Sequence, residues 1–175
     1  MAHQPQDLPG RTVSLSDIQK GKVFVTRCKP RLEYAWDSGV AIGRYLEELK
    51  NGKLIGKKCN KCHRVMVPPR MFCELCFRPT DDWVYLKDRG HVNTFSICYV
   101  NWDASRVKEP FMPAVIEIEG ASKGMGIMHL LGEVKPEDIK IGMVVEAVWR
   151  PAEEREGSIT DIKYFKPMTP RRARH

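Results

Sequence analysis

Between residues 38 and 50, apolar positions repeat with the period of an α-helix. Four of them, at i, i+3, i+4 and i+7, would form one stripe of such a helix: Ile42, Tyr45, Leu46 and Leu49. Asp37 or Ser38 can cap its start, and Asn51 followed by Gly52 supplies a left-handed stop. The pattern predicts a helix whose apolar face packs on the neighbouring segment or docks on another protein.

Beyond residue 81 the pattern changes to short runs that are rich in β-branched and aromatic residues, separated by glycine-containing turns. The predicted strands cover residues 83–88, 91–100, 113–119, 125–131, 143–150 and 159–167. Residues 135–142 predict a single helical turn, and residues 101–113 predict a loop long enough to reach a partner. Five or six strands over about 85 residues favour a small closed barrel, for which an OB-fold is the economical choice.

The chain divides around these two patterned regions. Residues 14–25 predict a short helix capped by Ser14 or Ser16, which then passes into a β-prone run. We expect a mainly β protein with N-terminal helices. Its segments are a partly disordered extension over 1–36, a helix plus cysteine module over 37–80, a barrel over 81–168 and a basic tail over 169–175.

The composition is that of a soluble globular protein of 175 residues, 42% of them hydrophobic. No apolar run approaches the roughly 18 residues that a membrane helix needs, and the first residues lack a secretory pattern, so we predict a cytoplasmic location. Lysine and arginine number 29 against 22 aspartate and glutamate, a net charge of +7. Part of the excess lies in residues 20–31 and 171–174, and its sign favours polyanions such as nucleic acids or phosphate-bearing cofactors.

The candidate chemistry is concentrated in "KKCNKCHRVMVPPRMFCELC", residues 57–76. It holds two Cys-x-x-Cys pairs, Cys59 with Cys62 and Cys73 with Cys76, separated by ten residues. Each pair can aim two thiolates at one ion, and two pairs complete the tetrahedral shell that zinc prefers. The spacing therefore predicts one zinc ion, with iron as the alternative metal.

Four thiolates fill the coordination sphere, whereas catalytic zinc keeps a position open for water or substrate. The predicted ion is therefore structural, and ligation of that kind contributes on the order of 10 kcal/mol to folding. His63 could compete as a ligand, but four cysteines already suffice. The two remaining cysteines, Cys28 and Cys98, have no accompanying histidine-bearing motif, so we expect no independent catalysis.

Taken in order along the chain, these features resemble the DUF35 family, also described as OB-fold acyl-CoA-associated zinc-ribbon proteins. A helix is followed by "LIGKKCNKCHRVMVPPRMFCELC", "DDWVYLKDRGHVNTFSICYV", "PFMPAVIEIEG" and "EDIKIGMVVEAVW". The resemblance spans about residues 39–167, and its most specific parts besides the cysteines are residues 68–70, 89–96 and 141–146.

The resemblance implies a rubredoxin-like zinc ribbon followed by a C-terminal OB-fold. It also implies an accessory subunit that assembles with a thiolase-superfamily enzyme into a hetero-oligomer, which makes or cleaves C–C bonds in acyl-CoA substrates. Settings of the family include archaeal acetoacetyl-CoA thiolase with hydroxymethylglutaryl-CoA synthase, steroid side-chain aldolases and benzoylsuccinyl-CoA thiolase. Family members often carry glycine after the second cysteine of each pair, where this chain has His63 and Phe77.

A subunit of this kind would wall the partner's acyl-CoA channel and contact the phosphate-bearing end of coenzyme A. The candidate contacts are the cations around the cysteines, Lys57, Lys58, Arg64 and Arg70. The candidate partner anchors are large apolar residues of the predicted helix and loops, Trp36, Tyr45, Leu49, Trp102 and Phe111.

The competing hypothesis is a nucleic-acid-binding module, because OB-folds and zinc ribbons both occur in such proteins and the charge has the right sign. Against it, the predicted strands lack a dense alternation of aromatic and basic residues. One of them carries Glu117 and Glu119, where a surface that follows phosphates would prefer lysine. We therefore favour the accessory subunit.

Overall fold

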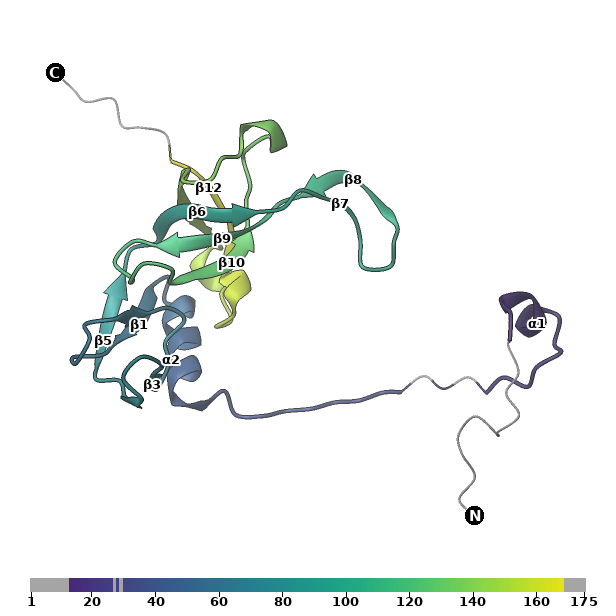
Figure 1. Cartoon of the computed structure of the whole chain (residues 1–175), viewed down its shortest axis with the longest axis horizontal. Helices are drawn as coiled ribbons and strands as arrows, with labels where there is room; N and C mark the ends of the chain where they lie inside the picture. The colour runs from purple at the N-terminus through teal and green to yellow at the C-terminus, as the bar shows by residue number, and fades with distance from the viewer. Residues whose placement is uncertain (1–12, 27, 29, 169–175) are drawn as a thin grey trace, which may run out of the picture. The chain divides into compact units, whose positions relative to one another are not determined.

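The computed structural model describes residues 13–26, 28 and 30–168 (Figure 1). The chain divides into two units, residues 1–36 and 37–175, which are considered separately. The disorder expected at the extreme N-terminus and the basic tail over 169–175 lie outside the described residues.

Among the residues described in the first unit, Leu15–Gln19 form a short helix, α1. Ser14 is the cap: its Oγ accepts a hydrogen bond from the Asp17 N–H, and the Asp17 side chain accepts one from the Ser14 N–H. This reciprocal pair is the capping box that satisfies free backbone donors at a helix start. The β-prone residues 23–25 are not a strand, because a strand exists only where another one pairs with it.

The second unit begins with helix α2, Gly39–Lys50, close to the predicted 38–50. The Gly39 N–H donates to Asp37 Oδ1 at 3.0 Å, and Gly52 beyond the helix has a φ of +70°. The buried stripe differs by one position from the prediction. It consists of Ala41, Tyr45 and Leu49, with Leu46 partly buried at its side, and Ile42 is exposed. The small Ala41 lets the helix lie closer to the sheet than Ile42 would.

The cysteine module is built from very short strands around one longer strand. A three-stranded antiparallel sheet has the order β2-β1-β5, and β3 pairs with β4. Their bounds are β1 Leu54–Lys58, β2 Val65–Met66, β3 Phe72–Cys73, β4 Arg78–Pro79 and β5 Asp82–Leu86. Strand β5 was predicted as part of the barrel, but it pairs along its length with β1, so it connects the two modules.

The C-terminal module is a five-stranded antiparallel sheet with the order β10-β9-β6-β11-β12. Its bounds are β6 Arg89–Phe95, β9 Pro113–Ile118, β10 Gly126–Leu130, β11 Val144–Trp149 and β12 Ile162–Pro167. The two outer strands meet at one parallel bridge between Leu131 and Phe165. A five-stranded sheet whose third and fifth strands meet in parallel is the partly open barrel of an OB-fold, which confirms the predicted fold class but not full closure.

Three short 3-10 turns complete the C-terminal module: η2 Pro136–Asp138, η3 Ala152–Glu154 and η4 Ile159–Asp161. The first is the single turn predicted within residues 135–142. The buried carboxylate of Asp161 accepts hydrogen bonds from three consecutive backbone N–H groups, residues 156–158, and so holds the last loop in place.

Residues 101–113 are not the open loop that the sequence predicts. Residues Cys98–Val100 form β7 and residues Arg106–Phe111 form β8, and the two strands pair with each other. In Figure 1 this pair projects beyond the ends of β6 and β9. The sequence did not predict this hairpin as strands. Neither of its faces is buried, so apolar and polar residues do not alternate along it.

One hydrophobic core runs through helix, ribbon and barrel. Strand β9 shows the alternation of a half-buried strand, with Ala114, Ile116 and Ile118 buried. Tyr45 and Leu49 of α2 belong to the same contiguous cluster of buried residues. The two modules therefore share one core.

Gly90 in β6 is required by close approach of two strands. A Cβ at this position would lie 2.0 Å from the Glu117 carbonyl oxygen of β9. We expect Gly90→Ala to lower the free energy of unfolding by about 1–3 kcal/mol, since the strands must separate to admit the methyl group. Urea unfolding measures this.

The matched control is Gly43→Ala in α2, where a Cβ would meet no atom within 4 Å. This change should raise the free energy of unfolding by about 0.5–1 kcal/mol, because alanine is the better helix former. Equal effects of the two substitutions would contradict the close packing of β6 on β9.

Candidate metal centre

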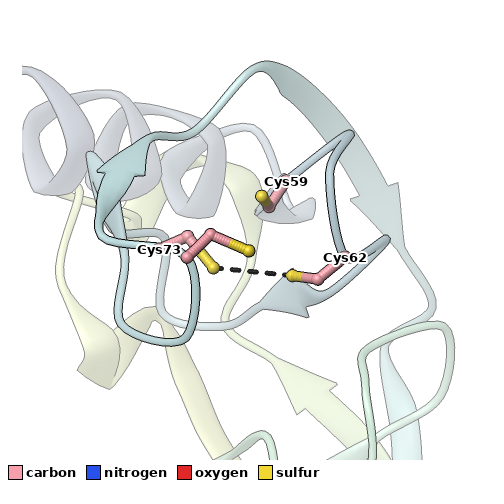
Figure 2. Close-up of side chains that lie close together, drawn as sticks. Cys59, Cys62 and Cys73 are labelled. Atoms are coloured by element: carbon pink, nitrogen blue, oxygen red, sulfur yellow. Dashed lines mark hydrogen bonds between the residues drawn. The ribbon is translucent and has the colours of Figure 1, made fainter.

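The four cysteine sulfurs of the two pairs converge on one point. The Sγ atoms of Cys59, Cys62, Cys73 and Cys76 all lie within 4.8 Å of one another. Those of Cys62 and Cys73 are 3.6 Å apart (Figure 2). A tetrahedral zinc with bonds near 2.3 Å requires sulfurs about 3.8 Å apart. The cluster therefore fits one tetrahedral ion, as predicted, and His63 lies outside it.

Two tight turns bring each pair of sulfurs together. In the first, the Cys59 N–H donates to the Arg64 carbonyl at 2.9 Å, and in the second, the Phe77 N–H donates to the Cys73 carbonyl at 2.9 Å. The residues after the second cysteines adopt left-handed backbone, with φ of 60° at His63 and 48° at Phe77. The turns thus have the geometry that glycine would favour, held here by larger side chains.

The protonation of the sulfurs is uneven. The backbone N–H of Cys62 lowers the pKa of Cys59 to about 6, whereas burial raises the pKa of Cys76 to about 12. Four adjacent thiolates repel one another, so the metal-free cluster retains protons. A dication would displace those protons and hold all four thiolates, so metal affinity in this cluster falls as the pH falls.

A metal ion in such a site has a structural role and not a catalytic one. Four thiolate ligands leave a tetrahedral zinc no position for water or substrate, so the ion would act as a clamp on two turns. Cys59 and Cys73 are buried and belong to the hydrophobic core. The clamp is therefore continuous with the packing of α2 and the barrel.

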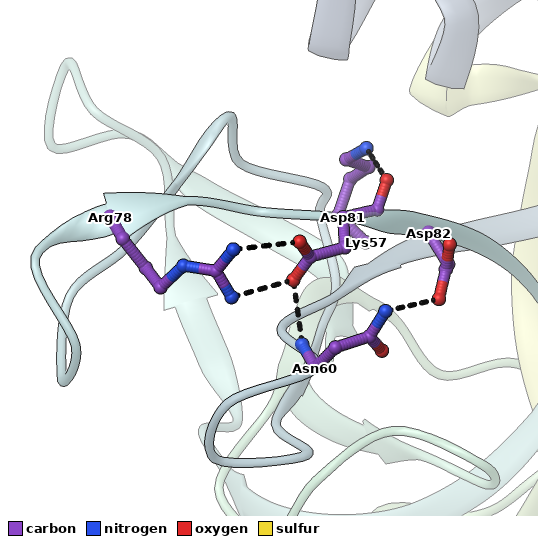
Figure 3. A network of polar contacts seen from close by, with 5 residues as sticks. All are labelled: Lys57, Asn60, Arg78, Asp81 and Asp82. Carbon is purple, nitrogen blue, oxygen red and sulfur yellow. Dashed lines mark hydrogen bonds and ion pairs between the residues drawn. The ribbon is translucent and has the colours of Figure 1, made fainter.

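A carboxylate network fastens the clamp to the rest of the fold (Figure 3). The two oxygens of Asp81 accept from both terminal nitrogens of Arg78, at 3.0 and 3.1 Å, and one also accepts from the Asn60 N–H at 2.7 Å. The Asn60 N–H and then the Arg78 charge lower the pKa of Asp81 below its ordinary 3.8. The network stabilises the fold above that pH and loses this contribution as the pH falls through the lowered pKa.

Lys57 was predicted to contact coenzyme A, but its side chain is buried within this chain. Its side chain is only 4% exposed, and its Nζ donates to the Asp81 carbonyl at 2.7 Å. The ammonium also lies 4.8 Å from the ring centroid of Trp83. A buried charge needs such partners, so Lys57 is committed to the interior because β1 is covered on both sides.

The other three predicted cations are less available than the sequence indicates. Arg64 Nε and Arg70 Nη1 lie 3.0 and 3.9 Å from the same carboxylate oxygen of Glu74. Lys58 is half-buried at the end of β1. Their role toward coenzyme A stays a prediction.

The predicted partner anchors separate into two groups. Tyr45 and Leu49 are 3% and 0% exposed and pack in the core, so they are not accessible on the surface of this chain. Periodicity alone does not distinguish a helix face that packs within the chain from one that docks on a partner. Trp36, Trp102 and Phe111 are exposed, and their contact with a partner stays a prediction.

Sequence reasoning missed a second set of cations. A surface cavity of about 520 Å³ lies where β1, β5 and the start of β6 meet. Lys53, Lys87 and Arg89 line it, together with Tyr85. Lys87 and Arg89 both form ion pairs with Glu119, and Lys53 lies over the Tyr85 ring. No sequence pattern marks these residues, because only the pairing of β1 with β5 makes Lys53 a neighbour of the others.

Two family models match consecutive parts of the chain. Residues 46–82 match the rubredoxin-like zinc ribbon domain of ChsH2, and residues 83–150 match its C-terminal OB-fold domain. A DUF35 domain-containing scaffold protein of Methanocaldococcus jannaschii is 37% identical over 118 residues, which are 66% of this chain and 82% of that protein. This chain belongs to the DUF35 family. The metal predicted from the cysteine spacing is thus the single zinc of a DUF35 zinc ribbon.

Other DUF35 proteins agree with this assignment. A scaffold protein of the family from Methanothermobacter thermautotrophicus is 30% identical over 66% of this chain and 87% of its own length. A solved DUF35 structure from Sulfolobus solfataricus aligns with a TM-score of 0.52 and 28% identity, over 60% of this chain and 75% of that one. The Ltp2-ChsH2(DUF35) aldolase aligns with a TM-score of 0.54 over 77% of this chain and 98% of that one. At 20% identity, the last shows a common fold alone.

The four-cysteine site should hold zinc in the purified protein. The purified chain should contain one zinc per molecule by elemental analysis, and Cys73→Ser should lose it and unfold the ribbon. Such sites contribute on the order of 10 kcal/mol to folding, more than packing among these short strands can replace. The tryptophan fluorescence of the chain, to which Trp83 beside Lys57 contributes, reports the unfolding.

The matched control is Cys98→Ser, outside the cluster in β7, which should keep the zinc and the fluorescence. Retention of zinc by Cys73→Ser would show that the coordination does not need this sulfur and would contradict a four-thiolate site.

Phe77 has a strained backbone at the second cysteine turn. This side chain is 90% exposed and its φ is 48°. Left-handed backbone costs a non-glycine residue about 1–2 kcal/mol, and part of this is offset by the flexibility of glycine in the unfolded chain. Phe77→Gly should therefore raise the free energy of unfolding by about 0.5–1 kcal/mol, measured with the metal bound.

Leu75 provides the comparison, because it is exposed on the same turn and has no positive φ. Leu75→Gly should destabilise by about 0.5–1 kcal/mol. If both glycine substitutions destabilise the chain, the strain at Phe77 is absent.

Proposed function

We propose that this chain is a scaffold subunit that assembles with an enzyme acting on acyl-CoA substrates and does not supply that enzyme's reacting groups. The observation that carries the proposal is that four cysteine thiolates would fill the coordination sphere of the metal. A metal with no open position stabilises the fold and does not bind substrate. Family membership supports it, because two relatives are described as scaffold proteins.

The partner we propose is a thiolase-superfamily enzyme that forms or cleaves a C–C bond. The resemblance of the sequence to family members found with such enzymes supports this choice. The fold shared with the Ltp2-ChsH2(DUF35) aldolase is compatible with it. A rigid ribbon and barrel with a common core would give the partner a fixed wall.

We propose that the wall contacts the nucleotide end of coenzyme A, which carries a 3′-phosphate and a pyrophosphate. Lys53, Lys87 and Arg89 line the cavity beside Tyr85 and supply more positive charge than its one acidic lining residue, Asp88, removes. Lys58 and Arg70 remain further candidates near the ribbon. Because Glu119 partly neutralises Lys87 and Arg89, the cavity alone should bind weakly, and the partner is expected to complete it.

The rival hypothesis of nucleic-acid binding has less support. On the barrel sheet, Glu117 accepts from the Asn93 side chain and the Gly124 N–H, and the pKa of Glu117 is lowered by the latter contact first. A carboxylate held ionised on this sheet would repel phosphates. No described helix is long and apolar enough to cross a membrane; a cytoplasmic location stays our proposal.

The test is purification of the tagged chain from its own organism. We expect an acyl-CoA C–C lyase or synthase subunit to co-purify. That subunit should be poorly soluble or inactive alone and regain activity when this chain is added. Full activity of the enzyme without this chain would contradict a required scaffold.

A gel shift with single-stranded DNA and RNA near physiological salt separates the two hypotheses. Strong binding there, with no enzyme co-purifying, would favour the nucleic-acid module.

A further inference from the structure

The projecting pair β7–β8 is the far half of one long hairpin. Its near half is β6 with β9, where Phe95 pairs with Ala114, and its far half opens with Cys98 paired with Phe111. The Ser96 N–H donates to the Pro113 carbonyl at 2.9 Å between the two halves, so the ladder continues. Residues 96–113, here called the β-arm, therefore extend from the rigid barrel and are anchored in its sheet (Figure 1).

Burial stops where the β-arm begins. The near half of the hairpin buries Val92, Ala114 and Ile116, whereas none of residues 96–113 is buried. Yet the β-arm carries four exposed large apolar side chains: Tyr99, Val100, Trp102 and Phe111. A two-stranded hairpin without a packed face is marginally stable in water, so a contact that buried these side chains would stabilise the β-arm.

The tip of the β-arm is locally ordered. The Asn101 N–H donates to the Ser105 carbonyl at 2.8 Å, and the Ala104 N–H donates to the Asn101 carbonyl at 3.0 Å. Both the N–H and the hydroxyl of Ser105 donate to Asp103 Oδ1. This closed turn presents Trp102, whose side chain is 97% exposed. Displaying an indole from an ordered turn reduces the entropy lost when it is bound.

The edge of the β-arm is protected against pairing with another strand. Pro110 in β8 has no N–H to donate, Lys108 carries a charge, and the pairing of β7 with β8 is irregular between Cys98 and Val100. Proline, lysine and bulges are the devices by which exposed edge strands avoid edge-to-edge association. A second copy of this chain joined through the strand edge is therefore disfavoured.

The charge of the β-arm favours contact with a protein over contact with a polyanion. Its two acidic residues, Asp103 and Glu109, balance its two basic residues, Arg106 and Lys108, in a chain of net charge +7. A surface that contacts a polyanion would concentrate positive charge. The β-arm instead combines cancelled charge with exposed aromatic side chains, which matches an apolar pocket with a polar rim on a protein.

We propose that the β-arm inserts into an apolar pocket of the partner enzyme and that Trp102 is its anchor. This inference rests on the proposed function, since it assigns the surface by which the scaffold grips its enzyme. Tryptophan at the centre of an interface commonly dominates binding energy, and the barrel sheet gives the β-arm a rigid base.

The experiment uses the native complex, isolated through the tagged chain, with fluorescently labelled wild-type chain as tracer. Unlabelled variants compete with the tracer for the co-purified enzyme subunit. Trp102→Ala should need at least about 30-fold more protein than wild type for half displacement, the loss of a typical anchor. Trp102→Phe, which keeps an aromatic ring, should recover most of the lost affinity.

Ile141→Ala is the matched control, an exposed apolar residue outside the β-arm, and it should compete like wild type. Because Trp102 makes no buried contact, all three variants should melt at the wild-type temperature. If Trp102→Ala displaces the tracer as well as the wild-type chain does, the proposed role of the β-arm is overturned and the scaffold function is left intact. If no enzyme subunit accompanies the wild-type chain, both proposals fall.

Two further outcomes would replace the proposed occupant. Sedimentation that shows a wild-type dimer and a Trp102→Ala monomer would assign the β-arm to a second copy of this chain. Binding of single-stranded DNA that Trp102→Ala abolishes would assign it to nucleic acid. Either result overturns the inference.

Discussion

Convergence of four sulfurs on one ion is the interaction on which the ribbon depends. Strands β2, β3 and β4 have two residues each, and such strands cannot fold on their own pairing. A metal clamp replaces the missing core by fixing both turns at once. Because Cys59 and Cys73 are also part of the hydrophobic core, the order imposed by the metal passes directly into the packing of the helix and barrel.

Strand β1 connects the ribbon to the rest of the second unit. It pairs with β2 of the ribbon on one side and with β5 on the other, and β5 leads within a few residues into the barrel. The Asp81 carboxylate, at the start of β5, holds both Asn60 of the first turn and Arg78 beyond the second. Ribbon and barrel are thus joined by strand pairing, by this carboxylate and by a common core.

The described surface combines charged side chains that pair with one another and apolar side chains that are exposed. Many charges are already paired within the chain: Glu119 holds Lys87 and Arg89, and Glu74 lies against Arg64. These paired cations are less available to a polyanion than free cations would be. The large apolar side chains of the β-arm, in contrast, have no contacts that bury them. Apolar contact rather than charge is the interaction that the described surface offers to a partner.

The sequence by itself determined the elements that depend on local chemistry. Cysteine spacing identified the metal site, helical period and caps located α2, and turn residues with β-branched runs located most of the barrel strands. Tertiary structure decided which neighbours each element has. It buried Lys57, and it packed the face of α2 that carries Leu49 within the chain, an alternative that the helical period had left open. It paired β5 with β1 of the ribbon sheet. It also turned a predicted loop into the β-arm. The reason is that period and spacing describe one chain segment, whereas burial and strand partners depend on segments distant in sequence.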